Sequence, residues 1–170
     1  MLIRKIKSIG FWDPSKIRDK IHRDDATTPG DTIADLKTEK NGLSVWYTPN
    51  TDEENIYPIV AAIATSRESI QKMTYVVLDE EELSNIGIQH VQTDGIAPGV
   101  TNPEILNRHY DLINIDYKRI GLLADYIHQL IEGQKGRTIS DKKMIQFIRR
   151  LIEEGGINKD ELKPGIKDNL

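Results

Sequence analysis

The chain has 170 residues, of which 38% are hydrophobic and 29% are charged, and its formal net charge is −4. This length is enough for one domain with a core of its own. The absence of cysteine excludes a disulfide scaffold, a cysteine-based zinc site and a cysteine nucleophile. The sequence has no signal-peptide pattern and no run of about 18 apolar residues, so we expect a cytoplasmic protein without a membrane span.

The first 92 residues predict short strands that alternate with helices. β-branched and aromatic residues gather in four runs that we expect to be strands, at 2–9, 43–48, 74–78 and 88–92. Asp13 followed by Pro14 is a typical helix start, with the aspartate as N-cap and the proline at the first helical position. Further helices are predicted from apolar periodicity and acidic first turns, at 31–38, 52–69 and 79–86.

The segment 93–103 breaks this alternation, because it holds two glycines and two prolines. After it, apolar residues recur every three or four positions from Leu106 to Ile131, which predicts a long helical stretch over 103–133. A second helix is predicted over 140–154, with Ser140 as its cap. We therefore expect an all-helical C-terminal region.

These elements predict an α/β (or α+β) fold, with a three- to four-stranded sheet flanked by helices and the helical C-terminal region packed on it. Helical connections between strands favour parallel pairs. The strand at 74–78 is apolar on both faces, so its sheet needs helices on both sides. We expect a mixed half at 1–95 and a helical half at 96–170 that form one compact unit, with the break as the point where the chain turns back over its sheet.

Charge is distributed unevenly along the chain. From Lys135 onward nine Lys and Arg face six Asp and Glu, a balance of +3 that leaves −7 for the preceding residues. A weakly basic tail on an acidic body can bind an acidic partner or a nucleic acid. The simpler interpretation is a solvated helix face, and few aromatic residues accompany the basic ones, which gives nucleic-acid binding weak support.

Arg108, His109 and Asp111 form the densest group of functional side chains. On the helix predicted after the break, Arg108 and Asp111 are three residues apart and can pair. A substrate or anion could bind there, because a helix N-terminus favours negative charge. The alternative is a salt bridge that docks the helix on the rest of the protein.

A second candidate site combines residues from three predicted elements. Arg18, His22 and Arg23 lie at a helix end, where they could bind an anion or transfer a proton, or simply complement the helix dipole. Tyr47 lies on the strand 43–48, and Glu80 follows the strand 74–78, at the end where α/β sheets bind ligands.

Phosphate-binding glycine loops, nucleophile elbows and zinc-binding histidine pairs do not occur in the sequence, so no metal site is predicted and the sequence identifies no cofactor. We expect a small binding or accessory protein that acts through protein contact or self-association by its helical C-terminal half. The alternative is an enzyme acting on a nucleotide or nucleic acid, with the catalytic candidates His22, Tyr47 and Glu80. Their order of basic, aromatic and acidic residues also occurs in some NAD-using transferases.

Overall fold

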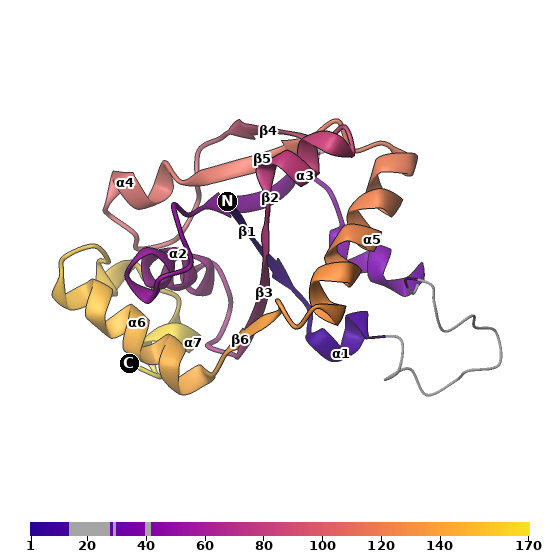
Figure 1. Ribbon diagram of the computed structural model, residues 1–170. Coiled ribbons are helices and arrows are strands. Elements are labelled where there is room, and N and C mark those ends of the chain that lie inside the picture. The colour runs from indigo at the N-terminus through magenta and orange to yellow at the C-terminus, as the bar shows by residue number, and fades with distance from the viewer. Residues whose placement is uncertain (14–27, 29, 40–41) are drawn as a thin grey trace.

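The computed structural model describes residues 1–13, 28, 30–39 and 42–170, and its centre is one antiparallel sheet (Figure 1). The sheet has six strands in the order β4-β5-β2-β1-β3-β6, and every neighbouring pair among them is antiparallel. The strands are β1 (Leu2–Ile6), β2 (Leu43–Tyr47), β3 (Met73–Leu78), β4 (Gln89–Gln92), β5 (His109–Ile113) and β6 (Arg137–Ile139).

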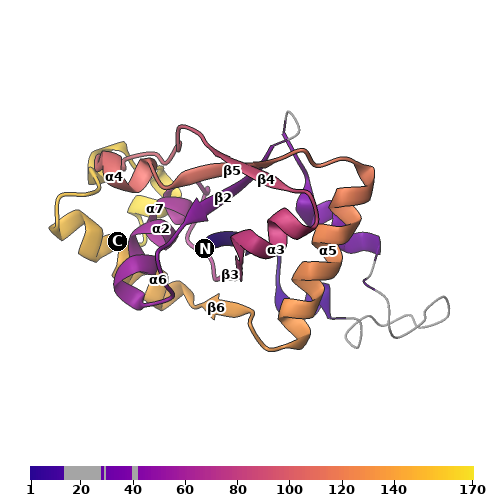
Figure 2. The same ribbon diagram turned by 45° about the horizontal axis from the view of Figure 1, so that its top comes forward.

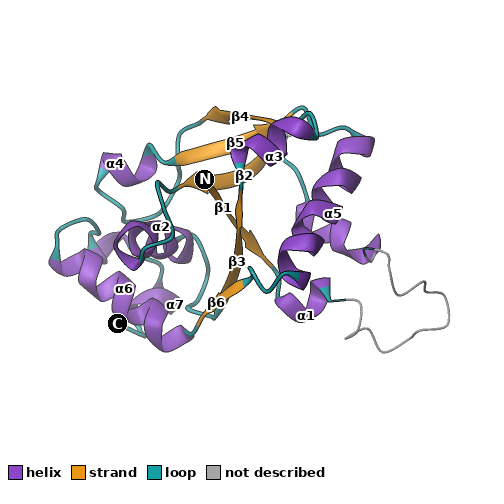
Figure 3. Ribbon diagram, in the orientation of Figure 1, coloured by secondary structure: helices purple, strands orange, loops and turns teal. Residues whose placement is uncertain are grey.

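Helices cover both faces of this sheet (Figures 2 and 3). On one face lie α2 (Glu53–Thr65), α4 (Pro103–Leu106), α6 (Asp141–Glu153) and α7 (Pro164–Lys167). On the other lie α1 (Ile9–Trp12), the 3₁₀ helix η2 (Gly30–Leu36), α3 (Glu80–Asn85) and α5 (Tyr117–Glu132). A short 3₁₀ helix, η3 (Lys159–Glu161), precedes α7. The fold is therefore a three-layer α+β arrangement.

Strand alternation divides the apolar side chains between two cores. Successive residues of a strand point to opposite faces, so Met73 and Tyr75 of β3 enter one core while Val76 and Leu78 enter the other. We call the first the α2–α6 core and the second the α5 core, after the main helices in each. The predicted need for helices on both sides of the strand at 74–78 is met by these two layers.

The predicted fold is wrong in its strand count, its parallel pairs and its all-helical C-terminal region, because the sheet has six antiparallel strands and two of them follow the break. Residues 109–113 match a helical spacing in the sequence, but they pair with β2 on one side and β4 on the other. Asn114, with φ of 63°, ends β5 before α5 begins. The expected helix over 103–133 is thus split into α4, β5 and α5.

The break at 93–103 closes against the C-terminal segment. Val100 bridges to Ile157, and the Asn158 amide donates to the Gly99 carbonyl at 2.7 Å. Gly99 has φ of +77°, and a Cβ there would lie 2.8 Å from Cδ2 of Leu162. A glycine is needed at this position because both the left-handed backbone and the close approach exclude a side chain.

Ion pairs within the molecule neutralise part of the charge difference between the two parts of the chain. Three basic side chains of the C-terminal part form ion pairs with glutamates of the first half, namely Lys143 with Glu53, Arg150 with Glu54 and Lys163 with Glu68. Nucleic-acid binding by the segment 135–170 remains a prediction, but these cations already have protein partners.

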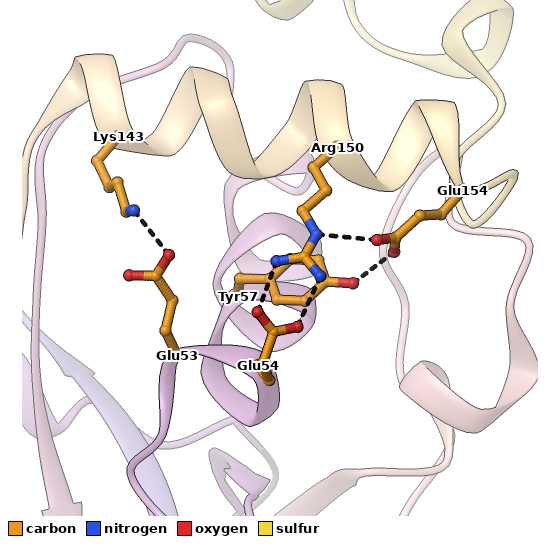
Figure 4. Close-up of polar contacts among 6 residues, drawn as sticks. All are labelled: Glu53, Glu54, Tyr57, Lys143, Arg150 and Glu154. Atoms are coloured by element: carbon orange, nitrogen blue, oxygen red, sulfur yellow. Dashed lines mark hydrogen bonds and ion pairs between the residues drawn. The ribbon is translucent and has the colours of Figure 1, made fainter.

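The pair of Arg150 with Glu54 belongs to a network between α2 and α6 (Figure 4). Arg150 donates two hydrogen bonds to the Glu54 carboxylate, at 2.9 and 2.6 Å, and one to Glu154 at 2.9 Å. Its guanidinium lies 4.1 Å from the ring centroid of Tyr57, and the Tyr57 hydroxyl donates to Glu154. Bidentate pairing and cation–π contact join the two helices at their exposed surface.

This network makes stability depend on pH at both ends of the scale. The hydrogen bond from Arg150 lowers the pKa of Glu54, and those from Tyr57 and Arg150 lower the pKa of Glu154, below the ordinary 4.5. Burial and the bond to Glu154 raise the pKa of Tyr57 to about 12 from 10.0. The carboxylates stabilise the fold above pH 4.5 and lose this effect as the pH falls through their lowered pKa values. Stability also falls as the pH rises from 10.0 to about 12.

We expect Glu154→Gln to lower the melting temperature by a few degrees at neutral pH, because the charge that binds Arg150 and Tyr57 is lost. The difference from the native protein should shrink as the pH falls below 4.5 and through the lowered pKa of the native Glu154 carboxylate. Thermal melts across pH measure this. Glu153→Gln, which changes an exposed neighbour on α6, is the control. A difference that stays constant with pH would contradict the assignment.

Candidate functional site

The helical layer over the α2–α6 core leaves the β4 end of the sheet open. Trp46 of β2 is the outermost strand residue in that core, and beyond it lies a cleft of about 650 Å³. Ser44 and Val91 both pair with Asp111 of β5, so these three side chains stand in a row on the same face. The cleft is lined by Arg4, Lys37, Glu39, Gly42, Ser44, Val91, Thr93, Asp94, Ile96, His109, Asp111 and Ile113.

His109 joins the polar floor of this cleft. Its Nε2 lies 2.7 Å from the Ser44 hydroxyl, and its Nδ1 lies 2.8 Å from the Thr93 hydroxyl. Burial lowers the pKa of His109, while Asp111 and the Thr93 backbone oppose this shift. The imidazole is therefore neutral at neutral pH, with one nitrogen donating and the other accepting.

Close packing holds the histidine ring in place. Trp46 meets His109 edge to face, with ring centroids 5.0 Å apart. Gly95 follows Thr93 closely, and a Cβ at Gly95 would lie 3.0 Å from the His109 Cβ and 2.8 Å from the Leu106 carbonyl oxygen. The glycine at the start of the break therefore allows the chain to pass close enough for Thr93 to reach the imidazole.

Arg4 adds a positive charge at the cleft wall. Its Nη1 donates to the Ser44 carbonyl and its Nη2 to the Asp35 carbonyl, each at 2.9 Å. Its Nε is buried and has no hydrogen-bond partner among the described residues. Burial lowers the pKa of Arg4 and the Asp35 carboxylate opposes this, yet an arginine stays protonated at neutral pH. The guanidinium thus lies beside the backbone that carries Ser44.

The predicted group Arg108, His109 and Asp111 is divided by the strand. His109 and Asp111 line the cleft, whereas Arg108 directs its guanidinium to the Asn55 carbonyl at 3.4 Å. The expected pairing of Arg108 with Asp111 is absent from the described ion pairs, because Arg108 precedes β5 and its side chain extends to α2 instead.

Tyr47 and Glu80 lie on the opposite face of the sheet from the cleft. The Tyr47 ring is 6.3 Å from that of Tyr110, which is 5.5 Å from the His90 ring. Glu80 is 3.4 Å from His90 Nε2 and 2.6 Å from the amino group of Met1. Tyr47 and Glu80 therefore lie at the two ends of one row of contacts, in which the glutamate already binds the Met1 ammonium and contacts the His90 ring. The other members of that predicted site, Arg18, His22 and Arg23, lie outside the described residues.

A second concave region follows the other edge of the sheet. Two adjoining cavities of about 560 and 480 Å³ share Thr51, Tyr75 and Arg137. The strand β6 pairs with β3 only as far as Tyr75, so the rest of β3 faces this region. Two polar side chains of this region are already used, since Asp79 caps α3 and Lys143 binds Glu53.

Ser44 and Thr93 were missed by the sequence analysis. The alternation in 43–48 places Ser44 on the face opposite Leu43 and Val45, which is a signal that its face is not core. Nothing local links it to His109, because 65 positions separate them in the chain. Only the pairing of β2 with β5 brings them together.

Together, the fold and the cleft define the class of this molecule: a three-layer α+β protein with an open polar cleft at one end of an antiparallel sheet. Comparison of the chain with protein families, curated proteins and solved structures found no match. In the part of the chain that the structure describes, no three or more of His, Asp and Glu are grouped to hold a metal ion. Nor is any helix there long and apolar enough to cross a membrane.

Proposed function

We propose that the protein is a binding protein that holds an extended segment of a partner protein as an added strand on β4, beside the cleft. The observation that carries this proposal is that β4 is the last strand of the sheet and that no described strand pairs with its outer edge. Edge strands are commonly blocked by lysine, proline or bulges, but the sequence of β4 is Gln-His-Val-Gln. A free edge of this kind can bind a peptide through its main-chain groups.

Exposed apolar side chains beside β4 support the same surface. Val91 is 43% exposed and Ile96 is 84% exposed, and both line the cleft with Ile113. Apolar residues that gather at a concave polar site are more informative than scattered ones. Alternate side chains of an added strand would lie over this rim.

The charges of the cleft favour a partner segment with basic side chains. Glu39, Asp94 and Asp111 give the cleft three carboxylates. The cations in its lining are Lys37 and Arg4, and Arg4 is already held by two carbonyl groups. A segment that alternates apolar and basic residues would therefore match both the rim and the carboxylates.

The sheet edge replaces the C-terminal helices as the surface that we expect to contact a partner. The apolar side chains of α6 are already used in the α2–α6 core: Met144, Phe147, Ile148 and Leu151. Those of α5 are used in the α5 core. Neither helix keeps its main apolar face for a partner, which is why β4 is the better surface.

The test uses an eight-residue peptide of alternating valine and lysine as a probe. We expect it to bind the native protein, and we expect Val91→Lys to weaken binding by at least about tenfold, because it adds a charge to the edge and removes the apolar contact. Ile33→Lys, at a residue 40% exposed on η2 across the sheet, is the matched control. Titration with amide chemical shifts locates the peptide.

Shifts confined to β4 and β5 would support an added strand. Equal binding by the native protein and Val91→Lys, or shifts centred on α5 or α6, would overturn it. Sedimentation of the protein alone tests the self-association version, in which a second copy supplies the strand, since Val91→Lys should then convert a dimer to a monomer.

A further inference from the structure

We infer that Ser44 is a nucleophile with His109 as its general base, and that the cleft transfers acyl groups from activated esters to water. This activity goes beyond the proposed binding of a partner segment and does not require it. Its basis is the hydrogen-bonded chain from Ser44 through His109 to Thr93, at 2.7 and 2.8 Å, on the floor of a cleft of about 650 Å³.

The hydrogen bonds from Ser44 through His109 to Thr93 have the order that a base-activated serine needs. The base must lie within hydrogen-bond reach of the nucleophile, and a third group must hold the base in orientation. With Nδ1 donating to Thr93, Nε2 is left to accept the Ser44 proton. Trp46 and the close approach of Gly95 fix the ring from its other sides.

Asp111 and Arg4 place opposite charges near Ser44 and His109. The Asp111 carboxylate lies on the same strand face as His109 and favours the imidazolium that appears when the proton is taken. Arg4 lies on the other face of the sheet, since it pairs with Val76 of the α5 core, and its Nη atoms donate to the carbonyls of Ser44 and Asp35. Its fixed positive charge beneath Ser44 favours the negative charge that develops in the cleft on the ester oxygen.

The reaction balances without any further reagent. Ser44 Oγ bonds to the ester carbonyl carbon while its proton passes to His109 Nε2. The tetrahedral intermediate then expels the alcohol, which takes the proton from Nε2, and leaves Ser44 acylated. Water attacks the acyl group, gives one proton to Nε2 and releases the carboxylic acid, and Ser44 recovers its proton.

The substrate class is an ester with a small acyl group, because Ser44 is exposed on the sheet while apolar contact is limited to the rim formed by Val91, Ile96 and Ile113. An amide is a poorer candidate, since its amine is a harder leaving group. An apolar alcohol on the ester could lie on the same rim that the proposal for β4 uses.

The test is hydrolysis of p-nitrophenyl acetate by the full chain, together with mass spectrometry of the acylated protein. We expect one acetyl group on Ser44, and a rate that falls by about 10²- to 10⁴-fold in His109→Gln, the range for loss of a general base. Ser44→Ala should lose the acetylation. Ser84→Ala, at an exposed serine of α3, is the matched control and should keep both.

The pH profile of the hydrolysis rate distinguishes a histidine that acts as a general base from one that has only a structural role. The rate should rise with pH to a plateau, with its midpoint below the ordinary 6.5 of histidine, as the direction of the shift requires. Thr93→Val should lower the rate and leave the melting temperature nearly unchanged. Acetylation spread over lysines, or a native rate in Ser44→Ala, would overturn the inference.

Failure of this inference can be told from failure of the proposed function. The valine–lysine peptide is titrated into Ser44→Ala as well. Peptide binding without acetylation of the native protein would leave the binding function standing and reject the nucleophile. Acetylation of Ser44 without peptide binding would support the nucleophile and reject the binding function.

Discussion

Replacing Trp12 with alanine is expected to lower the free energy of unfolding by about 3–5 kcal/mol, the usual cost of truncating a large buried aromatic residue. Trp12 is 0% exposed and is among the largest fully buried side chains of the described chain. It is the last residue of α1 and its side chain lies in the α5 core, so its loss leaves a cavity between α1, η2 and α5.

Polar bonds at Trp12 add to the packing. Its indole N–H donates to the Asp35 carboxylate at 2.8 Å, and its carbonyl oxygen lies 3.2 Å from Nδ1 of His128. Asp35 also accepts from the Lys7 amide at 2.6 Å. The tryptophan therefore holds η2 and the end of β1 in place as well as the core.

Urea denaturation of Trp12→Ala and Trp12→Phe measures the two contributions. The phenylalanine variant keeps most of the volume and loses the bond to Asp35, so its cost should be smaller than that of the alanine variant. Equal costs would mean that the hydrogen bond, and not the cavity, dominates. A loss below about 1 kcal/mol for alanine would contradict the buried position.

The sequence predicted all four strands that precede the break, because their residues are locally distinct. Leu43 and Val45 are buried on one face with the exposed Ser44 between them, and Met73 to Leu78 is apolar on both faces. Each pattern is typical of a strand. The mistake at β5 has a physical cause. Tyr110 and Ile113 continue the spacing of α5, and a five-residue strand is too short to break that pattern. Its pairing with strands on both sides decides the conformation, and that pairing is not local.

The cleft could be predicted only in part for the same reason. His109 and Asp111 were identified as a polar group, but as members of a helix with Arg108. The structure keeps the two that share a strand face and separates the third. Ser44 lies on β2 and Thr93 directly follows β4, and no periodicity in one sequence shows which strands are neighbours in an antiparallel sheet.

On the opposite side of the sheet, Phe147→Ala is expected to cost about 3–5 kcal/mol of unfolding free energy. Phe147 is 5% exposed and lies in the α2–α6 core. Its ring centroid is 5.9 Å from that of Tyr57, and the Lys143 ammonium lies 4.9 Å from the ring. Truncation therefore removes core volume together with an aromatic pair and a cation–π contact.

Gln146→Ala, at the exposed neighbour of Phe147 on α6, separates packing from helix propensity. It should change the free energy of unfolding by no more than about 0.5 kcal/mol, since surface substitutions away from special features do little. If both variants cost the same, α6 would not be packed on the sheet through Phe147. If only Phe147→Ala is costly, α6 is part of the core, and its apolar face is not free for the partner that β4 is proposed to bind.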